Sequence, residues 1–79
     1  MNKARREKIE KIRETIQALI ADVETIRDEE QESYDNMPES FQMGDKGGQV
    51  EGNISCLEEV IDQLQQADET LDSAKGETL

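Results

Sequence analysis

Apolar residues recur at alternating intervals of three and four along the first third of the chain. They are Ile9, Ile12, Ile16, Leu19, Val23 and Ile26. This spacing places them on one face of a helix as a heptad seam and is incompatible with the alternation of a strand. Ile20 widens the face, which favours a bundle of several helices over a two-stranded coiled coil. We therefore expect a helix over about residues 3–35 whose seam contacts further helices.

The pattern is interrupted in the middle of the chain and then resumes. Pro38 and four of the five glycines lie between residues 36 and 52, so we expect a connector at 36–45, in which residues 38–43 can form one helical turn. The second apolar repeat comprises Val50, Ile54, Leu57, Ile61, Leu64 and Leu71. It predicts a second helix over about residues 46–74, with Asp45 as N-cap, Asn53 as the alternative start, and a frayed tail at 75–79.

The expected fold is all-α: residues 1–79 form one antiparallel two-helix hairpin that assembles into an oligomeric helical bundle. A chain of 79 residues with 33% hydrophobic and 3% aromatic residues has little material for a core of its own. The single cysteine, Cys56, cannot form a disulfide within the chain, and without histidine a zinc site is not expected. Self-association is the remaining way to stabilise so small a scaffold.

Charge is distributed unevenly along the chain. The net charge is −11, yet residues 1–20 carry six basic and three acidic side chains. An antiparallel hairpin brings the basic start of the first helix towards the acidic end of the second. We expect Arg5, Arg6 and Lys8 to lie beside the carboxylates at the far end of the second helix. These carboxylates are Asp68, Glu69 and Asp72.

Several function classes find no support in these residues. The chain has no histidine, no cysteine paired with a base and no phosphate-binding loop, so we expect neither an enzyme nor a cofactor. We identify no signal peptide and no apolar run long enough to cross a bilayer, so we expect a cytoplasmic protein without membrane contact. Its net charge also argues against direct nucleic-acid binding.

Two candidate binding surfaces remain, and they use opposite charges. A ligand site between subunits would combine the connector with the basic N-terminal segment, holding a planar anionic ligand by stacking, amide hydrogen bonds and cations. Its residues are Arg5, Arg6, Lys8, Tyr34, Asn36, Pro38, Gln42 and Gly48. Alternatively, an acidic surface would imitate a phosphate backbone and occupy the basic groove of a partner. Its residues are Glu29, Glu30, Glu32 and Asp35.

Each surface also has a purely structural interpretation. Connector aromatics commonly plug the end of a helical hairpin, and a run of carboxylates is commonly a solvated helix face. The residue pattern alone leaves these alternatives open.

The segment from Asp35 to Gln42 has the form D-N-x-P-E-S-x-Q and resembles a family of small acidic proteins of tailed bacteriophages and prophages. The resemblance implies a non-enzymatic anti-defence role in the host bacterial cytoplasm, exerted by stoichiometric binding. The favoured form is an oligomeric sponge for a cyclic-nucleotide or related immune signal. The alternatives are an acidic blocker of a nucleic-acid-binding immune effector, similar to an anti-CRISPR protein, and a structural or assembly scaffold.

Overall fold

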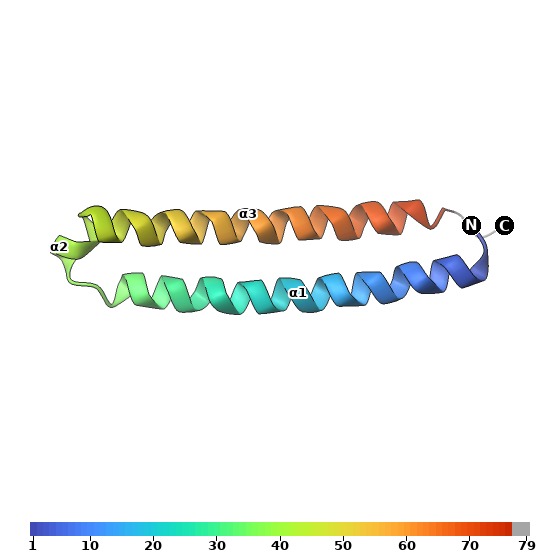
Figure 1. Cartoon of the computed structure of the whole chain (residues 1–79), viewed down its shortest axis with the longest axis horizontal. Coiled ribbons are helices and arrows are strands. Elements are labelled where there is room, and N and C mark those ends of the chain that lie inside the picture. Colours follow the sequence, from blue (N-terminus) through green and yellow to red (C-terminus); the bar gives the residue numbers. More distant parts are fainter. Residues whose placement is uncertain (77–79) are drawn as a thin grey trace.

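The computed structural model describes residues 1–76, and its regular structure in this range is entirely helical. In chain order the elements are α1 (Lys3–Asp35), α2 (Glu39–Gln42) and α3 (Asp45–Ala74). α1 and α3 run antiparallel side by side and α2 lies at the bend, giving a rod whose Cα atoms extend over 61 × 14 × 11 Å (Figure 1). The all-α class and the antiparallel hairpin are confirmed. Residues 77–79 of the predicted tail lie outside the described residues.

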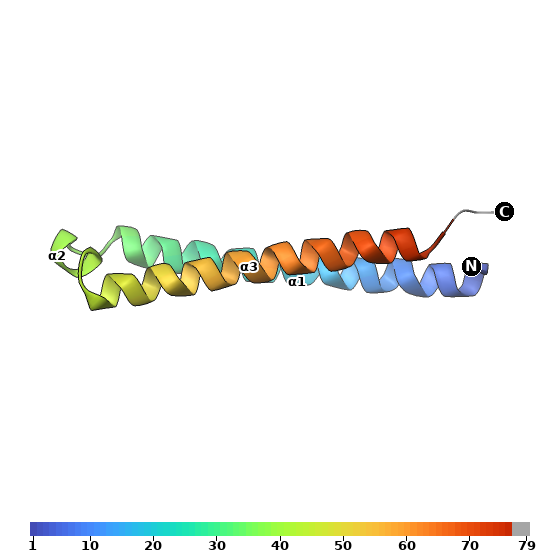
Figure 2. The same cartoon turned by 90° about the horizontal axis from the view of Figure 1, so that it is seen from above.

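The rod has two distinct ends. The terminal end contains residues 1–11 and 72–76, and the connector end contains residues 34–51. Seen from above, α3 crosses α1 at a shallow angle, so the two helices stay close along their whole length (Figure 2). Small crossing angles of this kind are typical of helices that interlock through heptad-spaced side chains.

The contact between the long helices is a regular seam. From α1 to the connector its residues are Arg6, Ile9, Arg13, Ile16, Ile20, Val23, Arg27, Glu30, Tyr34 and Met37. From α3 they are Gly47, Val50, Ile54, Leu57, Ile61, Leu64, Asp68, Leu71 and Lys75. Steps of three and four separate successive members on both helices, as in an antiparallel coiled coil. Among the described apolar side chains, only Ile54 and Ile61 are less than a tenth exposed, so the core is thin.

The structure divides the six residues that the sequence groups into one seam. Ile9, Ile16 and Val23 face α3 and are half-buried. The other three residues lie one position before seam positions and remain 50%, 46% and 49% exposed: Ile12, Leu19 and Ile26. A single neighbouring helix covers only one narrow stripe of α1, so a face of this width keeps its second column in solvent. Ile20 belongs to the covered stripe.

The caps set where the long helices begin. Asn2 caps α1, its Oδ1 accepting a hydrogen bond from Arg5 N at 2.9 Å. The prediction that Asp45 caps the second helix is wrong: Gly44 is the N-cap and Asp45 is the first helical residue. Gly44 has extended backbone angles, and no side-chain hydrogen bond caps α3. The start of α3 is instead fixed by the close approach of Gly47 to the last residue of α2.

Candidate functional sites at the two ends of the hairpin

An ion-pair network joins the helices near the terminal end. Arg13 Nε donates to Asp68 Oδ1 at 3.0 Å and Arg13 Nη2 to Asp68 Oδ2 at 3.3 Å, a bidentate pair inside the seam. Arg13 Nη1 also donates to Asp72 Oδ1 at 2.8 Å. Lys75 completes the network by pairing with Glu10, and with Asp72 at 3.0 Å. A charged layer therefore occupies seam positions where apolar residues stand elsewhere.

These contacts favour the ionised forms of the acidic side chains. The hydrogen bond from Arg13 lowers the pKa of Asp68, and Lys75 lowers the pKa of Glu10 and of Asp72. The acids favour the charged form of their partners in return, because the hydrogen bond to Glu10 raises the pKa of Lys75. The network is thus fully charged at neutral pH.

The cations in this network differ from those expected. The sequence places Arg5, Arg6 and Lys8 beside Asp68 and Asp72, but the structure pairs these carboxylates with Arg13 and Lys75. The register explains the difference: Glu10 already lies level with Lys75, so the first turns of α1 lie beside the very end of α3. The uneven distribution of charge correctly predicted that the start of α1 lies beside the end of α3. It did not identify the cations that pair with Asp68 and Asp72.

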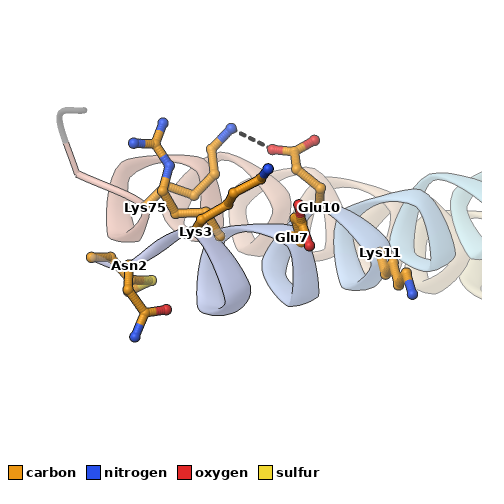
Figure 3. Close-up of a pocket in the computed structure, with 8 residues that line it drawn as sticks. Asn2, Lys3, Glu7, Glu10, Lys11 and Lys75 are labelled. Carbon is orange, nitrogen blue, oxygen red and sulfur yellow. Dashed lines mark hydrogen bonds and ion pairs between the residues drawn. The ribbon is translucent and has the colours of Figure 1, made fainter. Parts of the chain in front are cut away.

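The first turns of α1 instead border an open depression of about 750 Å³ at the terminal end. Its lining contains four cationic and two acidic side chains, together with Met1 and Asn2 (Figure 3). The charged residues are Lys3, Arg6, Glu7, Glu10, Lys11 and Lys75. Figure 3 shows Lys3 of α1 and Lys75, which follows α3, among the lining residues, with Lys75 bonded to Glu10. Of the predicted cationic ligand residues, Arg6 lines this depression; Arg5 and Lys8 are exposed outside it.

The connector end uses its polar groups within the chain. Gln42 Nε2 donates to the Tyr34 carbonyl oxygen at 2.8 Å, tying α2 to the end of α1. The interaction of the Tyr34 hydroxyl with the carboxylate of Glu51 on α3 raises the pKa of Tyr34. Asn36 is the C-cap of α1 and Pro38 the N-cap of α2. Of the predicted ligand residues, the structure thus brings Tyr34 and Gln42 together, and their contact holds the connector against α1.

Gly47 is the connector residue that sequence reasoning missed. It is buried, and a Cβ atom built on it would lie 2.1 Å from the carbonyl oxygen of Gln42. By contrast, Gly48, which was predicted to approach a ligand, has nothing within 4 Å of such an atom. The sequence does contain a signal for Gly47. Extending the heptad repeat of α3 back from Ile54 and Val50 makes Gly47 the next seam residue.

The predicted acidic surface is only partly continuous. Glu29, Glu32 and Asp35 are exposed near the connector end, whereas Glu30 is half-buried as a seam residue. Two exposed apolar side chains of the connector, Phe41 and Met43, lie at the same end, and Met43 is 82% exposed.

The two sets of predicted ligand residues lie far apart in one chain. Arg5, Arg6 and Lys8 are at the terminal end, and the connector residues are at the other end of a 33-residue helix. At about 1.5 Å per residue, that helix is roughly 50 Å long. A single ligand therefore contacts both sets only if a second chain brings one end beside the other.

Neither a metal centre nor a membrane span is seen in the described part of the chain. Within residues 1–76 no three Asp, Glu or Cys side chains gather as a cation site requires, and no helix there combines the length and hydropathy needed to cross a bilayer. No family model, curated protein or solved structure matches the chain.

Proposed function

We propose that this chain is a non-enzymatic, self-associating binding protein of the phage anti-defence type, which captures an anionic signal of the cyclic-nucleotide class at the terminal end. The observation that supports this proposal is the terminal-end depression. The chain has 20 acidic and only nine basic residues, yet four of the basic side chains line this one surface. Three of them belong to α1, and the fourth, Lys75, directly follows α3.

The depression suits such a ligand in size and chemistry. Its volume of about 750 Å³ falls within the range of small-molecule sites. Lysine and arginine side chains bind phosphate oxygens through charge-assisted hydrogen bonds, and arginine does so with two parallel donors. The carboxylate of Glu10 opposes an anion least, because Lys75 and Arg13 already pair with it. Within the lining four cations face two carboxylates, and salt screens the acidic residues that lie more than about 8 Å away.

The test is ligand binding by matched variants. Calorimetric titration and thermal unfolding with a panel of cyclic di- and trinucleotides should identify a ligand that stabilises the protein. The double substitution Lys3→Gln/Lys11→Gln should weaken its binding at least about tenfold, since two charged contacts are lost. Lys46→Gln is the matched control, because it removes a lysine at the connector end. Equal binding by all three proteins, or no stabilisation by any nucleotide, would refute the proposal.

A second candidate, an acidic blocker of an immune effector, is favoured by the connector end. The exposed Glu29, Glu32 and Asp35 belong to the last turns of α1, which lead to the exposed Phe41 and Met43 of the connector. An apolar contact within a charged rim is the usual composition of a protein-binding surface. Charge reversal of the three acids should abolish co-purification with the effector. A protein that oligomerises but binds neither nucleotide nor effector would act as an assembly scaffold.

A further inference from the structure

One side of the hairpin is apolar in its middle and nearly free of charge along α3. On α1 the exposed Ile12, Leu19 and Ile26 follow one another at intervals of seven. On α3 the exposed residues that directly precede a seam residue, as Ile12, Leu19 and Ile26 do on α1, carry no charge between positions 49 and 74. They are Gln49, Asn53, Cys56, Val60, Gln63, Ala67, Thr70 and Ala74. We call this side, with the three α1 residues, the apolar flank.

Both helices contribute to the same side of the rod. Ile26 of α1 shares a shallow depression with Asn53 and Cys56 of α3. Because the helices are antiparallel and both seams repeat every seven residues, one repeat further brings Leu19 level with Val60. The contacts of Arg13 with Asp72, and of Tyr34 with Glu51, lie on the opposite side of the seam. The charged contacts between the helices therefore lie on one flank of the hairpin, and the exposed apolar residues of α1 lie on the other.

We propose that the apolar flank is the contact surface for a second copy of this chain, packed antiparallel, so that α1 lies against α1 of the other copy and each connector end lies beside a terminal end. The inference specifies the surface and direction of the self-association proposed above and does not depend on ligand capture. The product is a four-helix bundle with twofold symmetry.

The placement of the apolar residues has the symmetry that this arrangement needs. An antiparallel pair of helices related by a twofold axis matches residues at equal distances on either side of the axis. Leu19 is the midpoint of α1, which spans Lys3–Asp35, and Ile12 and Ile26 lie seven residues to either side. Leu19 therefore meets its own counterpart, and Ile12 of each copy meets Ile26 of the other.

Charge at the edges of the apolar flank favours the same direction. Lys8, Asp22 and Glu29 share one exposed heptad position beside this flank, with Lys8 and Glu29 near opposite ends of α1. In the antiparallel arrangement Lys8, 11 residues before Leu19, comes within one residue of the level of Glu29 of the other copy, 10 residues after it, and symmetry makes two such contacts. If the connector ends were instead placed together, α1 would lie on the uncharged positions of α3, and the acidic connector ends would repel each other.

The flank also has sufficient area. The broad side of the rod measures 61 × 14 Å between Cα atoms, a footprint of roughly 850 Å². A standard interface buries about 800 Å² per partner. An antiparallel second copy covers nearly this whole side, because its length is the same.

The first experiment measures mass and dissociation by light scattering and analytical ultracentrifugation. We expect a dimer whose dissociation constant rises roughly tenfold with Lys8→Glu or with Glu29→Lys, and returns towards the original value in the double variant. Glu14→Lys, on the side of α1 turned away from the flank, is the matched control and should leave the constant unchanged. A monomer at all concentrations would overturn both the self-association and this inference.

The second experiment tests direction alone, in a Cys56→Ser background with a short bismaleimide. Leu19→Cys should cross-link to itself, and Ile12→Cys should cross-link only when mixed with Ile26→Cys. These substitutions are at exposed positions and preserve the hairpin seam. A dimer in which Leu19→Cys cross-links to Val60→Cys instead would overturn the antiparallel direction while leaving self-association intact.

Discussion

Replacing Gly47 by alanine isolates the contact that closes the hairpin. The added Cβ would lie 2.1 Å from the carbonyl oxygen of Gln42 and 2.5 Å from its carbon, whereas ordinary contacts begin at 3.4 Å. Both partners are backbone atoms, so α2 and α3 must separate by about 1.3 Å. This displacement disrupts the hydrogen bond from Gln42 to the Tyr34 carbonyl as well. Overpacking of this kind costs about 1–3 kcal/mol.

The helix itself gains from the same substitution. Alanine is favoured over glycine inside a helix by about 0.8–1 kcal/mol, which offsets part of the clash. Because the clash is with backbone, we place its penalty at the upper end and expect Gly47→Ala to destabilise the protein by about 1–2 kcal/mol. For a domain of this size the midpoint of thermal unfolding then falls by roughly 5–15 °C.

The neighbouring glycines provide the matched controls. Gly48 and Gly52 are also within α3, and a Cβ on either meets nothing within 4 Å. Gly48→Ala and Gly52→Ala should each stabilise the protein by about 0.5–1 kcal/mol, measured by circular dichroism during heating and urea unfolding at one protein concentration. If Gly47→Ala raised the midpoint as the controls do, the close approach of α2 to α3 would be incorrect.

Three further outcomes follow from the hairpin itself. Arg13 lowers the pKa of Asp68, so the stabilisation by this pair is complete above about pH 4 and is lost as pH falls through the lowered pKa. In Asp68→Asn the midpoint temperature of thermal unfolding should therefore fall less between pH 5 and 3 than it does in the original protein. Asn2→Ala removes the acceptor for Arg5 N and should destabilise the first turn by about 1 kcal/mol, seen as faster amide exchange there. Ile61→Ala, in the most buried layer, should cost about 2–4 kcal/mol in urea unfolding, and a loss under 1 kcal/mol would contradict that burial.

The helical course of the chain follows closely from its apolar spacing. The expected first helix covered residues 3–35, and α1 spans Lys3–Asp35. Pro38 and the glycines located the bend, where the turn expected over residues 38–43 is present as α2. Boundaries were recoverable because each is set by local chemistry: a capping side chain, a proline or the end of a repeat. The cap of α3 was missed because Gly44 acts there through backbone shape alone.

The partners of the charged residues could not be read from the sequence in the same way. Asp68 interrupts the apolar repeat of the second helix, but its partner depends on how far α1 slides along α3. A shift of one turn would pair it with a different cation, and local spacing does not determine that shift. The structure selects Arg13, itself at a seam position of α1, so two charged interruptions of two apolar repeats meet in one layer.

The division of the predicted seam has a physical reason that also bears on assembly. A helix with two apolar columns buries one against α3 and leaves the other, through Leu19, in water. With Ile54 and Ile61 as the best-buried apolar side chains among residues 1–76, the hairpin alone gains little from burial, while ordering each residue opposes folding by about 1–2 kcal/mol. Covering the second column with another copy adds apolar burial without ordering any new helix. If the apolar flank is the dimer contact, folding and association are therefore coupled, and the midpoint of unfolding must rise with protein concentration.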